Sequence, residues 1–168
     1  YVRISGVERD DGVSFPSGGM NLLSSNPTLT HVTIANNAGC RGGGMSLSSS
    51  NPTLTLVSIV NNVASSDGGG IYLNYSNPTL THVTISGNTS SYWGGGIYLV
   101  MSNPTLTNVT ISGNHSDSGG GIYIARSDPT LIYVTIENNT ANDRGGGLFI
   151  GRENGIDSNP TLSYVTIV

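Results

Sequence analysis

The sequence predicts an all-β protein that folds as a right-handed parallel β-helix of six rungs, with about 25 residues and three short strands in each rung. Three observations predict this fold. A proline-containing pair recurs at a nearly constant spacing, apolar residues alternate in short runs, and glycine is abundant (24 residues) while only 10% of the residues are charged. Amphipathic helices need long charged and aliphatic side chains at helical spacing, so this composition favours strands and tight corners.

The recurring pair is Asn-Pro, or Asp-Pro in one copy, and its copies are separated by 25, 26, 26, 25 and 31 residues: Asn26, Asn51, Asn77, Asn103, Asp128 and Asn159. Such a period is the signature of a solenoid. We therefore expect a single domain over residues 1–168, with repeats at roughly 1–25, 26–50, 51–76, 77–102, 103–127 and 128–168. The last repeat is longer because of an insertion near residues 151–157, and loops on a fixed scaffold vary in this way.

The spacing of apolar residues predicts the shape of one repeat. In residues 83–85 (Val-Thr-Ile) and 71–73 (Ile-Tyr-Leu) the apolar residues alternate, which indicates strands with one buried face. Leu80 and Val83 are three positions apart, so both point inward only if the chain turns a corner near His82. We expect three strands and three corners per rung, coiled with the right hand that such crossovers adopt.

Two columns of equivalent residues predict structural ladders. One is a column of asparagines that can bond their amides from rung to rung: Asn37, Asn62, Asn88, Asn114 and Asn139. The other is an outward aromatic column: Tyr72, Tyr98, Tyr123 and Phe149. Neighbours in such columns lie about 4.8 Å apart, close enough for amides to bond and rings to touch. We expect the asparagines to adopt the left-handed conformation at a corner, and a glycine triplet to form another.

The motif Ile-x-x-Asn, which first spans Ile34 to Asn37, and the motif Gly-Gly-x-Ile resemble the repeats of bacterial polymorphic outer-membrane proteins. They are also similar to the wider group of secreted right-handed β-helix proteins, which includes autotransporter passengers. The resemblance covers nearly the whole chain and implies an extracellular or cell-surface location. The same group contains surface adhesins, phage spikes and polysaccharide lyases, so the resemblance implies no single activity.

Charge and hydrophobicity exclude some classes of partner. The net charge of −4 leaves no basic stripe for a phosphate backbone, so we expect no nucleic-acid partner. No run reaches the roughly eighteen apolar residues of a membrane span, so we expect no membrane insertion by this segment. The single cysteine, Cys40, cannot form an internal disulfide.

The acidic residues of the variable loops are the candidates for chemistry. Asp67, Asp117 and Asp143 precede glycine triplets, near Arg41 and Arg144. Each repeat offers at most one carboxylate there, whereas glycosidic acid–base chemistry needs two and calcium needs several oxygen ligands. We interpret these residues as solvated loop charges and expect no catalytic residue, no cofactor and no metal. A calcium or sugar site is the alternative.

Two histidines share a column and suggest a metal site. Leu56 occupies the rung between His31 and His82. The two histidines therefore lie about 9.6 Å apart, too far to bind one ion, and we interpret them as surface residues.

The Thr-Leu-Thr segments predict a flat outward grid of hydroxyl groups: Thr28, Thr30, Thr53, Thr55, Thr79, Thr81, Thr105 and Thr107. Ice-binding solenoids carry such grids. Here Ile132 and Ser163 interrupt it, and threonine is in any case a favourable strand residue.

The first and last segments of the chain fall in the same Val-Thr-Ile column, which makes six residues candidates for end-to-end assembly: Tyr1, Val2, Ile4, Val165, Thr166 and Ile167. No polar cap is evident at either end, so we expect copies to stack head to tail into a fibre, or this segment to adjoin further β-helix rungs.

The leading hypothesis is a non-enzymatic extracellular module with a structural or adhesive role. Its expected partners are itself, neighbouring β-helix segments, glycans, or host and cell surfaces. The alternatives are a carbohydrate-binding or polysaccharide-cleaving β-helix, and an ice-binding solenoid.

Overall fold

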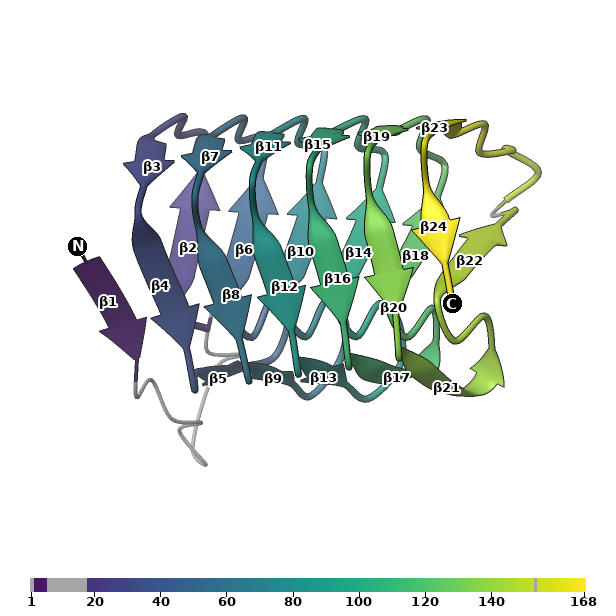
Figure 1. Ribbon diagram of the computed structural model, residues 1–168, viewed down its shortest axis with the longest axis horizontal. Helices are drawn as coiled ribbons and strands as arrows, with labels where there is room; N and C mark the ends of the chain where they lie inside the picture. The colour runs from purple at the N-terminus through teal and green to yellow at the C-terminus, as the bar shows by residue number, and fades with distance from the viewer. Residues whose placement is uncertain (1, 6–17, 153) are drawn as a thin grey trace.

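The computed structural model describes residues 2–5, 18–152 and 154–168, and over these residues the chain coils through parallel strands and contains no helix (Figure 1). The strands form four parallel sheets, named A to D, which the chain visits in the order B, C, A and D in every turn. Strands of one sheet that follow each other in space belong to successive turns. The predicted parallel β-helix is confirmed.

Sheet A contains the Val-Thr-Ile segments, and its seven described strands are β1 (Val2–Ser5), β4 (Val32–Ala35), β8 (Ser58–Val60), β12 (Thr84–Ser86), β16 (Thr110–Ser112), β20 (Thr135–Glu137) and β24 (Thr166–Ile167). Sheet B contains the Ile-Tyr-Leu segments, in β2 (Met20–Leu23), β6 (Met45–Ser48), β10 (Ile71–Asn74), β14 (Ile97–Val100), β18 (Ile122–Ala125) and β22 (Leu148–Gly151).

Sheet C contains the Thr-Leu-Thr segments, in β3 (Thr28–Thr30), β7 (Thr53–Thr55), β11 (Thr79–Thr81), β15 (Thr105–Thr107), β19 (Thr130–Ile132) and β23 (Thr161–Ser163). Sheet D consists of short strands that follow the asparagine column, in β5 (Ala38–Gly39), β9 (Val63–Ala64), β13 (Thr89–Ser90), β17 (His115–Ser118) and β21 (Thr140–Arg144).

The prediction of three strands per rung is wrong, because sheet D adds a fourth. Its first three strands have two residues each, too few to show an alternation of apolar side chains, but their backbones pair in register, with Val63 opposite Thr89. The number of turns also differs slightly. The six Asn-Pro or Asp-Pro pairs delimit five complete intervals, and the described coil makes about five turns.

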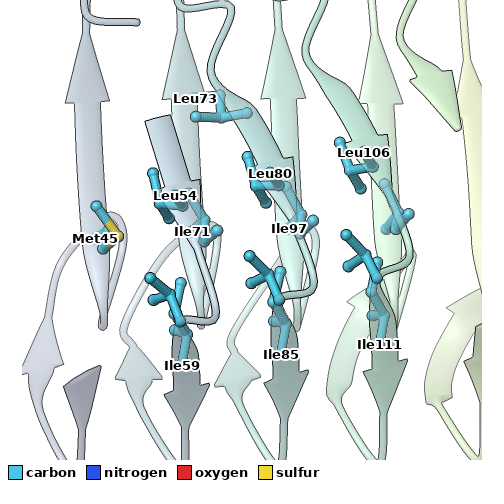
Figure 2. Packing of buried hydrophobic residues seen from close by; sticks show 14 of the residues in the cluster. Met45, Leu54, Ile59, Ile71, Leu73, Leu80, Ile85, Ile97, Leu106 and Ile111 are labelled. Atoms are coloured by element: carbon cyan, nitrogen blue, oxygen red, sulfur yellow. The ribbon is translucent and has the colours of Figure 1, made fainter. Parts of the chain in front are cut away.

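The core is a set of apolar columns that run along the axis of the coil. Figure 2 shows Leu54, Leu80 and Leu106 in one row, and isoleucines of sheet A in another. Leu80 and Val83 are both 1% exposed, so both point inward as their spacing predicts. Each apolar side chain therefore packs against its equivalents in the rungs above and below.

At each tight corner, the alternation of inward and outward side chains is shifted by one residue. His82 has a φ of 53°, so the chain turns between sheets C and A at the predicted position. At the corner before sheet B, Gly94 has a φ of 64°, and a Cβ on Gly95 would lie 2.4 Å from the carbonyl oxygen of His115. This corner therefore requires glycine both for its backbone conformation and for the close approach of the next rung.

The asparagine column lies inside the coil and bonds from rung to rung. Asn88 is fully buried; its backbone N donates to Asn114 Oδ1 at 2.9 Å, and its Nδ2 donates to the same oxygen at 3.0 Å and to the Ile59 carbonyl at 3.0 Å. The expectation that these asparagines adopt the left-handed conformation is wrong. That conformation belongs to the residue before each of them, such as Asn61 and Gly87, which lets the following amide point inward.

We expect Asn88→Ala to lower the free energy of unfolding by roughly 2–5 kcal/mol, because it leaves buried polar groups without partners. The backbone N of Asn62 donates to Asn88 Oδ1 at 2.9 Å and would lose that acceptor. The matched control is Asn77→Ala. Its oxygen accepts from the backbone of Asn103 at an exposed site, where water can substitute, so the loss should be about 0.5–1.5 kcal/mol. Urea denaturation measures both, and equal losses would contradict the prediction.

Candidate functional site

The outer face of sheet B carries a continuous aromatic column. Tyr72, Tyr98, Tyr123 and Phe149 lie opposite one another in β10, β14, β18 and β22, because the sheet is in register. Their ring centroids are separated by 5.5, 5.4 and 4.9 Å in that order, with tilted planes. These distances are those of favourable ring contacts, so the column is one packed surface.

Trp93 joins this column from the loop before sheet B. Its ring centroid lies 5.7 Å from that of Tyr98 and 5.5 Å from that of Tyr123. Tyr98 is thereby only 4% exposed, whereas Trp93 is 40% exposed and the neighbouring Tyr92 is 56% exposed. Trp93 is therefore the most exposed of the rings that pack together in this column.

Backbone hydrogen bonds hold the loop of Trp93 on both sides. The backbone N of Tyr92 donates to the Ser66 carbonyl at 3.0 Å, and the N of Ser118 donates to the Tyr92 carbonyl at 2.9 Å. The Trp93 carbonyl accepts from the Gly68 backbone at 2.8 Å and from Ser90 Oγ at 3.0 Å. The backbone of the loop is thus bonded to the rungs before and after it, and the Trp93 ring packs on two rings of the column.

A buried carboxylate and an arginine lie at one end of the column. Asp67 is 4% exposed; its Oδ2 accepts a hydrogen bond from Ser66 Oγ at 2.8 Å and lies 3.5 Å from Arg41 Nε. The guanidinium carbon of Arg41 lies 5.5 Å from the ring centroid of Tyr72. The interpretation of Asp67 as a solvated loop charge is therefore wrong, because the loop of the next rung covers it. Its Oδ1 is buried and accepts no hydrogen bond from the described residues.

The other acidic candidates are not brought together with Asp67. Asp117 is held by Asn142, whose Nδ2 donates to it at 2.8 Å, and Asp143 pairs with Arg144 at 3.2 Å. Neither His31 nor His82 belongs to a metal-binding group: the described residues contain no cluster of three or more histidine, cysteine, aspartate or glutamate side chains that could hold a metal ion. These observations identify no site for calcium within that part of the chain.

The threonine grid exists as a geometric array on sheet C. Thr79 lies opposite Thr53 and Thr105, and Thr81 lies opposite Thr55 and Thr107. Thr28 and Thr30 extend both columns in β3, where both are exposed. Ile132 and Ser163 follow Thr107 in one of the two columns, so the array is uniform only from β3 to β15.

Two further polar ladders flank the turn from sheet B to sheet C, and sequence reasoning missed both. A serine precedes every Asn-Pro or Asp-Pro pair, and the backbone N of each of the first five donates to the hydroxyl of the serine in the next rung, as Ser50 N donates to Ser76 Oγ at 3.0 Å. The Asn-Pro asparagines are linked in the same way at the surface, with Asn77 N donating to Asn51 Oδ1 at 2.6 Å. The period of the serine column was the signal that could have identified the first ladder.

The predicted assembly strands lie at opposite ends of sheet A. β1 pairs with β4, with Val2 opposite Val32 and Ile4 opposite Ile34. β24 pairs with β20, with Thr166 opposite Thr135. Val165 packs against the core as a partly buried residue, and Ile167 is 47% exposed. Tyr1 lies outside the described residues.

A family model described as a right-handed β-helix region matches residues 19–168, and the chain belongs to this family. The family includes both enzymes and non-enzymes. No curated protein and no solved structure matched the chain. Among the described residues there is no helix long and apolar enough to cross a membrane.

The burial of Asp67 predicts a pH dependence of stability. Desolvation raises the pKa of Asp67 above 3.8, and the opposing effects of the Ser66 hydrogen bond and the Arg41 charge do not offset it. The folded protein thus binds this proton more tightly than the unfolded chain, so the contribution is fully present below about pH 3.8 and is lost as the pH rises through the raised pKa.

We therefore expect the urea midpoint of the wild type to fall relative to that of Asp67→Asn as the pH rises through that window, because the asparagine stays neutral. Unfolding curves of both proteins from roughly pH 3 to 8 measure the difference. A difference that grows in favour of the wild type with rising pH would show that the Arg41 charge outweighs desolvation.

Proposed function

We propose that this β-helix is a non-enzymatic extracellular module with an adhesive role, and that it binds glycans on the outer face of sheet B. The observation that supports the proposal is the aromatic column with Trp93 held over Tyr98 and Tyr123. A sugar ring has an apolar C–H face that packs on an aromatic ring, and hydroxyl groups at its edge that need polar partners. Arg41 supplies charged donors at one end of this face.

The burial of Asp67, the carboxylate next to this face, favours binding without cleavage. Glycoside hydrolysis needs two carboxyl groups that reach the same glycosidic bond from opposite sides. The side chain of Asp67 is 6% exposed and already interacts with Ser66 and Arg41, so it cannot approach a polymer lying on the aromatic column. The rigid loop instead suits a surface that binds ligand without rearranging.

We expect Trp93→Ala to weaken glycan binding roughly two- to tenfold, which corresponds to the loss of about 0.5–1.5 kcal/mol of aromatic contact. A glycan array identifies the ligand, and titration of the best glycan against both proteins measures the change. Tyr133→Ala is the matched control, since Tyr133 is an exposed aromatic residue (54%) in the corner between sheets C and A, outside sheet B, where it stacks on Tyr164.

Two results would contradict the proposal. Unchanged affinity of Trp93→Ala, together with a loss in Tyr133→Ala, would move the binding surface to the other corner. Release of new reducing ends or unsaturated sugars from a polysaccharide panel would replace adhesion by an enzymatic role.

We also propose, as a second role, that copies of the chain assemble end to end. The regular stacking of successive rungs in four parallel sheets supports it, because a rung of a second copy could make the same contacts. An adhesive module that assembles in this way would present its glycan-binding face repeatedly along one fibre.

A further inference from the structure

Three residues occupy the position before the glycine triplet in successive rungs and form one column: Arg41, Asp67 and Trp93. Backbone hydrogen bonds join these rungs at the next residue, since Gly42 N donates to the Asp67 carbonyl at 2.9 Å and Gly68 N donates to the Trp93 carbonyl at 2.8 Å. Neighbours in such a column lie about 4.8 Å apart. Asp67 is therefore placed between the two residues that we assign to the glycan-binding face.

The Asp67 carboxyl group is buried between two exposed side chains. Asp67 is 4% exposed, whereas Arg41 and Trp93 are both exposed. Asp67 Oδ2 lies 3.5 Å from Arg41 Nε and accepts a hydrogen bond from Ser66 Oγ at 2.8 Å. Asp67 Oδ1 is buried and accepts no hydrogen bond from the described residues. A carboxyl group with an unpartnered buried oxygen lowers stability, and buried ionisable groups of this kind are common at functional sites.

Burial and the neighbours of Asp67 act on its charge in opposite directions. Desolvation is the largest effect and raises the pKa of Asp67 above 3.8, whereas the Ser66 hydrogen bond, the Arg41 charge and the Trp93 backbone N–H lower the pKa. Among the described residues, Arg41 is the charged group that acts on this carboxyl group. The ionised carboxylate is thus stabilised from both neighbouring rungs, by Arg41 on one side and by the Trp93 backbone on the other.

Each of these interactions acts in both directions. A group that stabilises ionised Asp67 is itself held more strongly while Asp67 is ionised. The guanidinium carbon of Arg41 lies 5.5 Å from the ring centroid of Tyr72, and the Trp93 ring packs on two tyrosines of the aromatic column. The charge of Asp67 therefore favours the positions of both residues on the outer face of sheet B, and a proton on Asp67 removes that support.

We propose that Asp67 is a positioning residue of the glycan-binding face, and that a proton on its carboxyl group weakens glycan binding. Ionised Asp67 holds Arg41 over Tyr72 and the loop of Trp93 over the aromatic column, whereas protonated Asp67 releases both. Asp67 acts through these residues, because its own side chain is buried. The inference rests on the proposed function and names the regulation of that site. A glycan that binds the held arrangement favours ionised Asp67, so its affinity rises with pH.

Fluorescence of Trp93 tests the positioning role without a ligand, because the chain has a single tryptophan. Quenching by acrylamide measures how accessible this ring is. We expect quenching of the wild type to decrease as the pH rises over roughly pH 3 to 8, and Asp67→Asn to lack this transition. The matched control is Asp143→Asn, which removes an exposed aspartate that pairs with Arg144 and should keep the transition. The same transition in Asp67→Asn as in the wild type would overturn the proposal.

Arg41→Gln separates the effect of charge from that of packing. Burial raises the pKa of Asp67 and the Arg41 charge lowers it, so removal of that charge should move the quenching transition to higher pH. The Arg41 side chain is exposed, so the substitution leaves no cavity in the core. Circular dichroism confirms that the variant is folded. A transition midpoint that does not move would show that Asp67 acts by packing alone and would overturn the proposal.

The pH dependence of glycan affinity tests the regulation. Titrations use the glycan that binds best in the array, at pH values across the quenching transition. We expect the affinity of the wild type to increase roughly three- to tenfold as the pH rises through the transition. Asp67→Asn, which stays neutral, should bind at every pH with about the affinity that the wild type has at low pH. An affinity that falls with rising pH, or an equal pH dependence in Asp67→Asn, would overturn the regulation.

The failure of this inference is distinguishable from the failure of the proposed function. A chain that binds no glycan of the array overturns the proposed function and with it the control of binding by Asp67. The quenching measurements need no glycan, so they still decide whether Asp67 positions Trp93. Weaker glycan binding by Trp93→Ala without a quenching transition in the wild type overturns the role of Asp67 alone.

Discussion

The buried asparagine column is the constraint on which the rest of the structure depends. Each inner asparagine carries amide and backbone donors that find an acceptor only in the adjacent rung, as Asn62 does on Asn88. A shift of one residue between rungs would leave those donors buried without partners and turn the apolar side chains outward. The column therefore fixes one register for all four sheets. The outward columns of aromatic rings and of hydroxyl groups are aligned because this interior ladder fixes the register.

Because the rungs are aligned, side chains on the surface can differ from rung to rung while the backbone of the coil stays the same. The backbone at the position before each glycine triplet is set by the corner, but its side chain differs in chemistry from rung to rung: Arg41, Asp67, Trp93, Ser118 and Arg144. The tryptophan fills this position in one rung and contacts the tyrosines of two strands. In the preceding rung the aspartate is covered instead, so its charge is desolvated and its pKa is raised. The same backbone position thus gives an exposed aromatic contact or a buried charge, depending on its neighbours.

The features that the sequence could predict are those that repeat with the rung. The apolar alternation, the asparagine column and the aromatic column recur in consecutive copies, so they are visible without coordinates. The strands of sheet D were missed because two residues, such as Val63 and Ala64, are too short to alternate. The contact of Trp93 with the tyrosines was missed because it occurs in one rung and lies in a loop of variable length. The burial of Asp67 depends on that loop as well, and the composition of its own repeat does not indicate it.

The proposed adhesion and the proposed assembly would use perpendicular directions of the coil, so neither would interfere with the other. The aromatic column faces outward from sheet B, whereas stacking contacts would run along the axis and reuse the interactions that join inner rungs. In a solenoid each rung contacts only its neighbours, so an end rung lacks about half of the contacts of an inner rung. Leu162 and Leu131 occupy the same column and differ only in whether a further rung covers them. A rung supplied by a second copy would therefore need only the interactions that already join the inner rungs.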